Sequence, residues 1–243
     1  MPSARGPFAG PSPSLQGVAY HQTLAAGWNR RYLRGGFKRR AAFFVNAILP
    51  LTSPEGDWID VGCGSGYFSR ILARRGARVL GVDGSAAMVE AAHAVSSGPK
   101  PHPRFELGTV ESLTGREALF DGVLCLSVLE YLDNPAASFG AMARMLRPGG
   151  CLIASAPNRN ARLRRLQLQA RRWASRFGFN LFAYLGSSKN AWSRWDLSTL
   201  AAAHGLSCQA IMGFDPLMPR FFWGIAPPSL LFLICRRPAG GEA

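Results

Sequence analysis

The stretch Trp58-Ile59-Asp60-Val61-Gly62-Cys63-Gly64-Ser65-Gly66-Tyr67 decides the fold. A short apolar run leads into three glycines at every second position, and a helical pattern with Phe68, Ile71 and Leu72 follows. This order predicts a strand, a tight turn and a helix whose N-terminus faces whatever binds at the turn. Glycine allows positive φ angles and leaves room for a ligand to approach the backbone.

The next strand ends on a carboxylate. Residues 78–82 form an apolar run that ends at Asp83, 21 positions after Gly62. An acidic side chain at this strand tip is where an α/β nucleotide fold binds a ribose diol. Because Tyr67 occupies the sixth position, G-x-G-x-x-G fails and G-x-G-x-G fits, and Asp60 completes D-x-G-x-G-x-G.

This motif resembles motif I of the class I S-adenosylmethionine (SAM) methyltransferases. The passages F-D-G-V-L-C-L-S-V-L-E-Y-L (120–132) and L-R-P-G-G-C-L-I-A-S-A-P-N (146–158) are similar to the core of the same superfamily. The resemblance covers residues 40–157 and implies an α/β, Rossmann-like sheet of order 3-2-1-4-5-7-6 with strand 7 antiparallel. Independently, alternating strands and helices predict a parallel sheet with helices on both faces and right-handed crossovers.

The expected elements follow from apolar periodicity and from stop signals such as Gly76 and Pro50. The expected strands are 58–61, 78–82, 104–107, 122–126, 151–155, 207–212 and 230–235, with a turn at 147–150. The expected helices are 37–49, 67–75, 86–95, 135–146 and 196–203.

The resemblance implies SAM as co-substrate, bound beyond the carboxyl ends of the strands beside strand 1. The implied cofactor residues are Arg40, Asp60, Gly62, Cys63, Gly64, Gly66, Asp83, Gly84, Ser85, Met88, Thr109, Val110, Glu111, Leu126 and Ser127. Many members hold the adenine amino group with an acidic residue after strand 3. Thr109 occupies the position where that acidic residue is most common, so we expect Val110 and Glu111 to contact the adenine instead.

Within the superfamily, the chain resembles the ubiquinone-biosynthesis O-methyltransferases, a type 11 methyltransferase group that methylates polyprenylated catechols and associates with membranes. The similar features are G-T-V-E after strand 3, L-E-Y-L after strand 4 and P-N-R at the start of a basic insertion. That group has E-x-x-E-H after strand 4, where this chain reads Ser127-Val128-Leu129-Glu130-Tyr131. Two of three candidate metal ligands are missing, so we expect no metal.

Glu130 and Tyr131 are the candidate catalytic bases, and pocket lining is their alternative role.

These features predict O-methylation of a small, hydrophobic, phenolic or quinol-type molecule. The alternative is a methyltransferase acting on RNA or another anionic macromolecule, or on an amine. The N/D-P-P-Y/F sequence of adenine N-methyltransferases is absent after strand 4. A formal net charge of +14 favours an anionic partner, although a basic solvated surface explains it equally.

Composition predicts three regions: a disordered tail rich in Pro, Gly and Ser (1–19), a basic N-terminal cap (20–50), and the methyltransferase domain (51–243) with a lid insertion at 158–192. No apolar run reaches the ~20 residues that a membrane span needs. The five cysteines lack C-x-x-C spacing and indicate reduced, buried thiols. We therefore expect a cytoplasmic protein.

The insertion contains a basic amphipathic segment. Residues 159–176 hold seven arginines and no acid. Leu163, Leu166, Ala170, Trp173 and Phe177 recur at helical spacing on one side, which we call the apolar stripe. Three interpretations are open: a lid over the substrate together with the aromatic loop 221–223, peripheral contact with an anionic membrane, and contact with nucleic acid. The first two can coexist.

Overall fold

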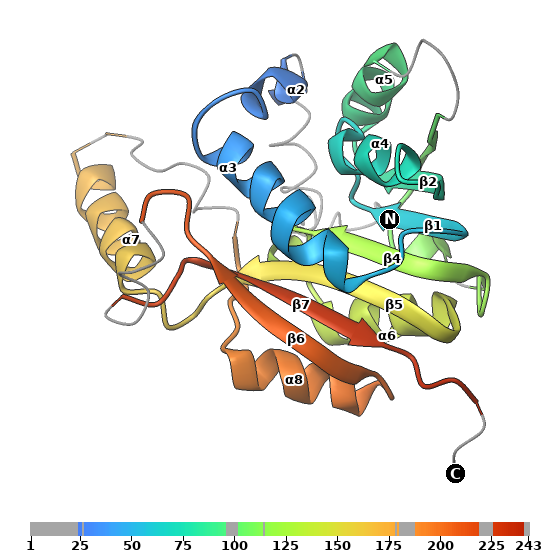
Figure 1. Cartoon of the computed structure of the whole chain (residues 1–243). Coiled ribbons are helices and arrows are strands. Elements are labelled where there is room, and N and C mark those ends of the chain that lie inside the picture. The colour runs from blue at the N-terminus through green and yellow to red at the C-terminus, as the bar shows by residue number, and fades with distance from the viewer. Residues whose placement is uncertain are drawn as a thin grey trace, which may run out of the picture.

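A computed structural model describes residues 24–25, 27–95, 102–113, 115–177, 179, 188–218 and 226–240. Its centre is a seven-stranded sheet of order β3-β2-β1-β4-β5-β7-β6 (Figure 1). β7 pairs antiparallel with both β5 and β6, whereas the neighbouring pairs from β3 to β5 are parallel. The predicted strand order is confirmed. The strands are β1 (Asp57–Val61), β2 (Arg78–Asp83), β3 (Arg104–Leu107), β4 (Phe120–Leu126), β5 (Leu146–Pro157), β6 (Ser207–Phe214) and β7 (Leu230–Arg236).

Helices cover both faces of this sheet. α3 and α4 lie on one face, and α6 and α8 lie on the other (Figure 1). Adjacent residues of β1 divide between these layers, because Trp58 packs with the α4 side and Ile59 with the α6 side. The described α-helices are α2 (Trp28–Arg31), α3 (Gly35–Phe43), α4 (Tyr67–Ala73), α5 (Ala86–Val95), α6 (Pro135–Met145), α7 (Arg162–Ser175) and α8 (Arg194–Ala203).

The end of the first long helix differs from the prediction. α3 begins at Gly35, continues as a π-helical turn (Phe44–Ile48) and closes with a 3-10 turn (Leu49–Leu51). Pro50 therefore lies inside the last turn instead of ending the helix before it. A proline is tolerated there because the first N–H groups of a helical turn have no partner within the turn.

The start of β5 also differs from the prediction. Residues 147–150, expected as a turn, belong to β5, and the register between β4 and β5 shifts between Phe120 and Gly122. Gly149 adopts a φ of 78°, and its N–H donates to the carbonyl of Arg237 at 2.9 Å. The four residues thus bulge from the sheet while keeping a main-chain partner.

All five cysteines are free thiols, as predicted, but Cys208 on the edge strand β6 is exposed and not buried. No helix within the described ranges is long and apolar enough to cross a membrane. The tail 1–19 and the aromatic loop 221–223 lie outside the described residues.

Candidate cofactor and acceptor site

The glycine turn after β1 closes tightly on its surroundings. Gly62, Gly64 and Gly66 have φ angles of 71°, 54° and 73°, a region that other residues rarely adopt. A Cβ atom on Gly62 would lie 2.2 Å from Cγ2 of Val128, and one on Gly66 would lie 2.3 Å from Cζ of Phe105. Both positions require glycine for close packing as well as for backbone conformation. Cys63 is buried beside them.

Asp83 at the end of β2 connects the turn to the next helix. Its Oδ2 accepts from the Gly64 N–H at 2.8 Å, and its Oδ1 accepts from the Ser85 N–H at 2.9 Å. Ser85 caps α5, because its Oγ accepts from the Met88 N–H at 3.3 Å. The carboxylate therefore lies at the carboxyl edge of the sheet, between the glycine turn and α5, with half-buried Gly84 beside it.

Asp60 is buried beneath the turn and is positioned to support it. The Ser69 hydroxyl donates to Asp60 Oδ2 at 2.5 Å. Burial raises the pKa of Asp60 to about 7, the Ser69 hydrogen bond opposes this rise, and the charge of Asp83 adds to it. Asp60 thus ties β1 to α4, and it is only 3% exposed.

The short helix α2 packs directly on the glycine turn. Asn29 Oδ1 accepts from the Ser65 hydroxyl and from Arg70 Nη2, both at 2.8 Å. The rings of Tyr32 and Tyr67 stack at 4.0 Å between centroids. Sequence reasoning missed Asn29, because a single amide on a short basic helix carries no signal of a partner 36 residues away.

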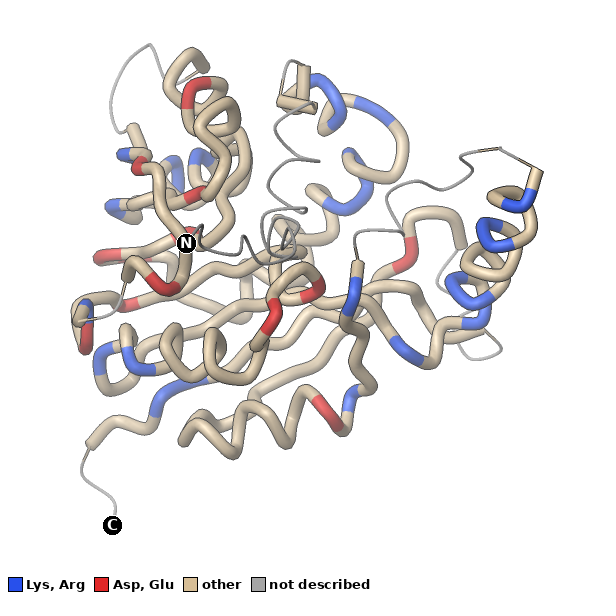
Figure 2. The backbone as a smooth tube through the Cα atoms, turned by 180° about the vertical axis from the view of Figure 1, so that it is seen from behind, with Lys and Arg blue, Asp and Glu red and all other residues tan. Residues whose placement is uncertain are grey.

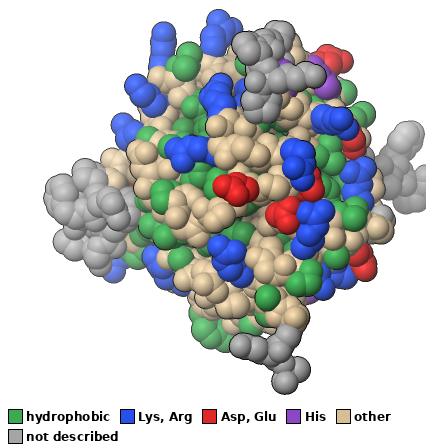
Figure 3. All heavy atoms as spheres, turned by 45° about the vertical axis from the view of Figure 1, so that its right-hand side comes forward, with side chains coloured by type: hydrophobic (Ala, Val, Ile, Leu, Met, Phe, Trp, Pro, Cys, Tyr) green, Lys and Arg blue, Asp and Glu red, His purple; other side chains and the backbone are tan. Residues whose placement is uncertain are grey.

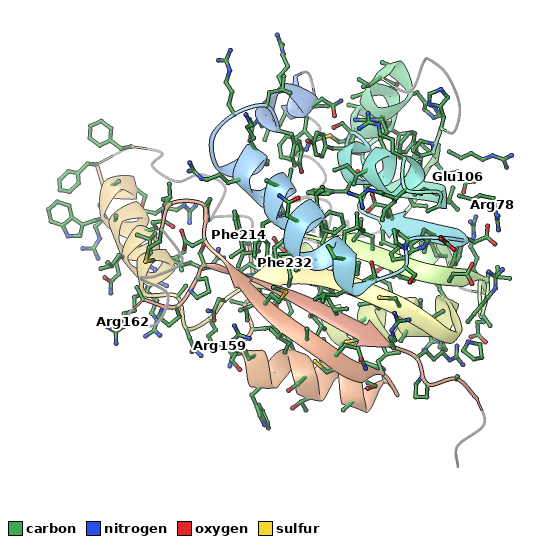
Figure 4. The ribbon with its side chains drawn as sticks, in the orientation of Figure 1. Arg78, Glu106, Arg159, Arg162, Phe214 and Phe232 are labelled. Carbon is green, nitrogen blue, oxygen red and sulfur yellow. The ribbon has the colours of Figure 1, made fainter. Side chains whose placement is uncertain are left out.

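A polar chain links α3 to the ends of β4 and β5. Arg40 Nη2 donates to Ser155 Oγ at 3.2 Å, and the Ser127 N–H donates to the same oxygen at 3.0 Å. Arg40 also lies over the rings of Phe68 and Phe232, at 5.7 and 5.9 Å from their centroids. Its Nε is buried and has no hydrogen-bond partner among the described residues. Figure 4 shows Phe232 beneath α3.

The backbone is strained at Ser127, where β4 ends. Ser127 has a φ of 58°, in the left-handed region that non-glycine residues adopt at a cost. The preceding Leu126 is buried. Ser155 was missed from the sequence, although a serine within the otherwise apolar end of β5 was an available signal.

Glu130 is the buried carboxyl group of the site. It lies on a 3-10 turn (Leu129–Tyr131) directly after β4 and is 5% exposed. Its Oε2 has no hydrogen-bond partner among the described residues. Burial raises the pKa of Glu130 to about 7, opposed by hydrogen bonds to the carboxyl group and by the charges of Arg40 and Arg164. A carboxyl group with such a pKa exchanges a proton near neutral pH.

The end of the insertion holds this turn in place. The N–H groups of Lys189 and Asn190 donate to the Glu130 carbonyl at 2.9 and 3.3 Å. The Asn190 side-chain amide donates to the carbonyls of Leu132 at 2.8 Å and Leu129 at 3.4 Å. Lys189 Nζ forms an ion pair with Asp133 at 2.6 Å. Sequence reasoning did not anticipate this clamp, because its two halves lie 58 to 61 residues apart.

The remaining predicted cofactor residues surround the ends of β2 and β3. Met88 is buried on α5, and Val110 is buried after β3. Thr109 and Glu111 are exposed, and Glu111 begins a 3-10 turn. Most of the predicted site residues therefore lie at the ends of β1 to β4 or directly after them, Met88 joins them from α5, and Arg40 joins them from α3. Tyr131 is half-buried next to Glu130.

Most of the apolar stripe of α7 is exposed to solvent. Leu166, Trp173 and Phe177 are 61%, 67% and 62% exposed, whereas Leu163 and Leu168 are half-buried. The lid interpretation stays a prediction, because the structure shows the stripe exposed and the aromatic loop 221–223 lies outside the described residues. Arg164 Nη2 donates to Ser188 Oγ at 2.7 Å, next to the clamp.

Comparisons with known proteins agree with this geometry. Residues 59–154 match a family described as a methyltransferase domain. The ubiquinone biosynthesis O-methyltransferase of Alkalilimnicola ehrlichii is 41% identical over 103 residues, covering 42% of this chain and 42% of that protein. The enzyme of the same name from Paracidovorax citrulli is 38% identical over 122 residues, covering 49% and 50%. The chain therefore spans about half the length, or less, of the curated relatives that it matches.

Solved structures show the same fold. Magnesium protoporphyrin IX methyltransferase from Synechocystis PCC 6803, with bound SAM, has a TM-score of 0.68 and 20% identity, covering 95% of this chain and 100% of that chain. An S-adenosylmethionine dependent methyltransferase from Mesorhizobium loti has a TM-score of 0.62 and 21% identity, covering 81% and 98%. Fold and matched segment agree: residues 59–154 are similar to a methyltransferase domain, and the chain has the Rossmann-like fold of these solved structures.

Proposed function

We propose that the protein is a SAM-dependent methyltransferase that acts on a hydroxyl group of a small, hydrophobic, phenolic or quinol-type acceptor. The observation that carries this proposal is the meeting of a glycine turn, the Asp83 carboxylate and the buried carboxyl group of Glu130 at one sheet edge. The curated relatives named above are O-methyltransferases. The described part of the N-terminal segment 20–50 serves as a cap, because α2 contacts the turn through Asn29 and α3 supplies Arg40.

The residues present fit the cofactor. Gly62 and Gly64 of the tight turn are only half-buried, and the Asp83 carboxylate beside them is the group that suits a ribose diol. The buried Nε of Arg40, which has no described partner, suits a carboxylate. Met88, Val110 and Glu111 are placed for the adenine side. When bound, SAM supplies a methyl group already activated by its sulfonium.

The protein then has to orient the acceptor, exclude water and remove one proton. Glu130 Oε2 accepts the hydroxyl proton as the bond to the methyl group forms, because its pKa of about 7 allows it to be ionised at neutral pH. The clamp through Lys189 and Asn190 fixes the turn that carries this carboxyl group. Tyr131 lines the acceptor side.

A methyl-label screen tests the proposal. Radiolabelled SAM is offered with catechols, hydroxyquinones, amines and bulk RNA, and we expect catechols or hydroxyquinones to take the label. Label in RNA, lost steeply as salt rises, would instead support the alternative that the +14 charge favours. Label only in amines would overturn O-methylation.

We further propose that turnover needs no divalent metal, because Ser127 and Tyr131 stand where the related group has acidic and histidine ligands. Turnover that EDTA abolishes and magnesium or zinc restores would contradict this.

We also propose that α7 lies at the surface of anionic membranes. Its stripe is exposed, and the arginines of residues 159–176 have no acid between them. Vesicles with anionic lipid should bind the protein, and Trp173→Ala should weaken binding. Co-sedimentation with neither anionic nor neutral vesicles would remove this proposal and leave the chemistry intact.

A further inference from the structure

A basic hollow lies between α2 and α3, outside the cofactor site. It has a volume of about 610 Å³, and its lining includes Arg30, Arg31, Leu33, Arg34 and Phe37. None of the three arginines forms an ion pair with an acid of the described chain. The first acidic residue of the whole sequence is Glu55, so the segment that lines the hollow contains no acid of its own, and Asp215, next to the Pro216 that approaches Gly36, is buried.

The shape of the hollow is set by its backbone and its aromatic floor. Gly27 and Gly35 have φ angles of 85° and 55°. A Cβ atom on Gly27 would lie 3.0 Å from Arg30 Nη2, so Arg30 folds back over this glycine. The Arg31 guanidinium lies 4.8 Å from the centre of the Trp28 ring.

Aromatic contacts hold the intervening turn rigid. Phe37 packs edge-on against Trp28 at 5.7 Å and against Tyr32 at 5.3 Å between ring centroids. Tyr32 is itself buried on Tyr67. The arginines therefore project from a fixed base, which lowers the entropy lost when they bind an anion.

Charge is distributed unevenly over the molecule. Lys and Arg gather along α2, α3 and α7 (Figure 2), whereas acidic and basic side chains are interspersed on the face seen in Figure 3. Exposed Leu33, at 65%, lies at the rim of the hollow. Arginine binds phosphate through paired N–H donors, and an apolar residue beside such a site favours lipid over a purely polar polyanion.

We propose that the hollow between α2 and α3 binds the phosphate of an acidic lipid headgroup. A lipid headgroup and a free phosphate would be recognised in the same way, because the guanidinium groups of Arg30, Arg31 and Arg34 bind the phosphate anion of either. The site is separate from α7, and its occupancy requires neither SAM nor acceptor.

The test compares two triple variants of equal charge. Arg30→Gln/Arg31→Gln/Arg34→Gln removes the hollow's guanidinium groups. The control Arg74→Gln/Arg75→Gln/Arg104→Gln removes three exposed arginines elsewhere. Circular dichroism and thermal melting establish that both are folded. Co-sedimentation uses phosphatidylcholine vesicles with and without phosphatidylglycerol at about 0.15 M salt, and calorimetry uses inorganic pyrophosphate.

We expect the hollow variant to bind anionic vesicles at least about tenfold more weakly than wild type, and the control to lose much less. If both variants lost vesicle binding equally, the proposed site would be overturned, and binding would be attributed to the positive charge of the whole surface. Pyrophosphate binding that only the hollow variant loses, without vesicle binding, would keep the phosphate site and overturn its lipid source. Binding of RNA in place of vesicles, lost in the hollow variant, would overturn the lipid proposal. The experiment measures binding and not methyl transfer. Its outcome can therefore be interpreted even if the proposed function is wrong.

Discussion

The parallel strands begin at one edge of the sheet, the amino edge, and end at the other, the carboxyl edge. The two edges differ in whether their polar groups are paired. At the amino edge, Arg147 pairs with Asp57 at 3.2 Å and with Asp121 at 2.6 Å, and Arg78 pairs with Asp57 at 2.7 Å. The hydrogen bond to Arg78, more than any other cause, holds the pKa of Asp57 below its usual value. Figure 4 places Arg78 at this end and Arg159 at the opposite end.

At the carboxyl edge the polar groups are incompletely paired within the described chain. Arg40 Nε and Glu130 Oε2 are buried without a partner, and Ser127 is held in a strained conformation. An unpaired buried polar atom costs ~1–3 kcal/mol, so each of these groups needs a partner that a ligand or a bound water supplies. From this contrast we infer that the paired charges of the amino edge stabilise the fold and that the buried, unpaired groups of the carboxyl edge are the candidates for function.

The largest expected effect is at Glu130. Glu130→Gln keeps the shape of the side chain and removes its ability to accept a proton, so kcat should fall by about 10²–10⁴. Single-turnover kinetics with the acceptor found in the screen measures this, and SAM affinity should stay nearly constant. A variant with wild-type kcat would assign Glu130 to pocket lining.

The next effect concerns the cofactor. Asp83→Ala removes the ribose acceptors and should weaken S-adenosylhomocysteine binding by about 2 kcal/mol or more, roughly thirtyfold. Calorimetry measures the affinity, with Glu106→Ala as a control for loss of an exposed strand carboxylate. Unchanged affinity in Asp83→Ala would remove the assignment of the cofactor site.

A pH series sharpens the comparison without an assay of activity. The pKa of Glu130 is about 7 in the folded protein and 4.5 as the unperturbed reference. The folded state therefore holds this proton more tightly, so its stabilising contribution is complete below about pH 4.5 and is lost as pH rises to about 7. Wild type should lose on the order of 3 kcal/mol over this window relative to Glu130→Gln. Asp60 contributes equally to both proteins, so the difference in their unfolding free energies isolates Glu130, and a flat difference would contradict its raised pKa.

A smaller effect is expected at the clamp. Asn190→Ala removes two hydrogen bonds to the turn that carries Glu130 and should lower kcat about tenfold. Asn160→Ala, in the same insertion, is the matched control. In the double variant with Glu130→Gln the two losses should not add, because Asn190 acts through Glu130. Additive losses would show an independent role.

The smallest effect is expected at the amino edge. Arg147→Gln breaks an exposed network and should lower the melting temperature slightly, because exposed ion pairs contribute little. Neither kcat nor SAM affinity should change. A loss of activity comparable to that of Asn190→Ala would break the distinction between the two edges.

The order of the sheet followed from the resemblance to the class I methyltransferases, whereas the positions of its strands followed from local signals. Gly62, Gly64 and Gly66 allow the positive φ angles of a tight turn, and Asp83 follows one strand later. β3 and α5 have the expected bounds because each is flanked by strong turn signals. The bulge at 147–150 was not predictable, since Arg-Pro-Gly-Gly is also typical of a free turn.

The sequence by itself determined the class of fold, and its resemblance to a known family implied the candidate site residues, which parallel strands place together because their carboxyl ends share one edge of the sheet. Only the tertiary structure decided which groups meet there: Arg40 with Ser155 across 115 positions, and Asn190 with the Glu130 turn. It also decided the direction of the α7 stripe. Helical periodicity states which residues share a face, but the direction of that face depends on which side the rest of the molecule contacts.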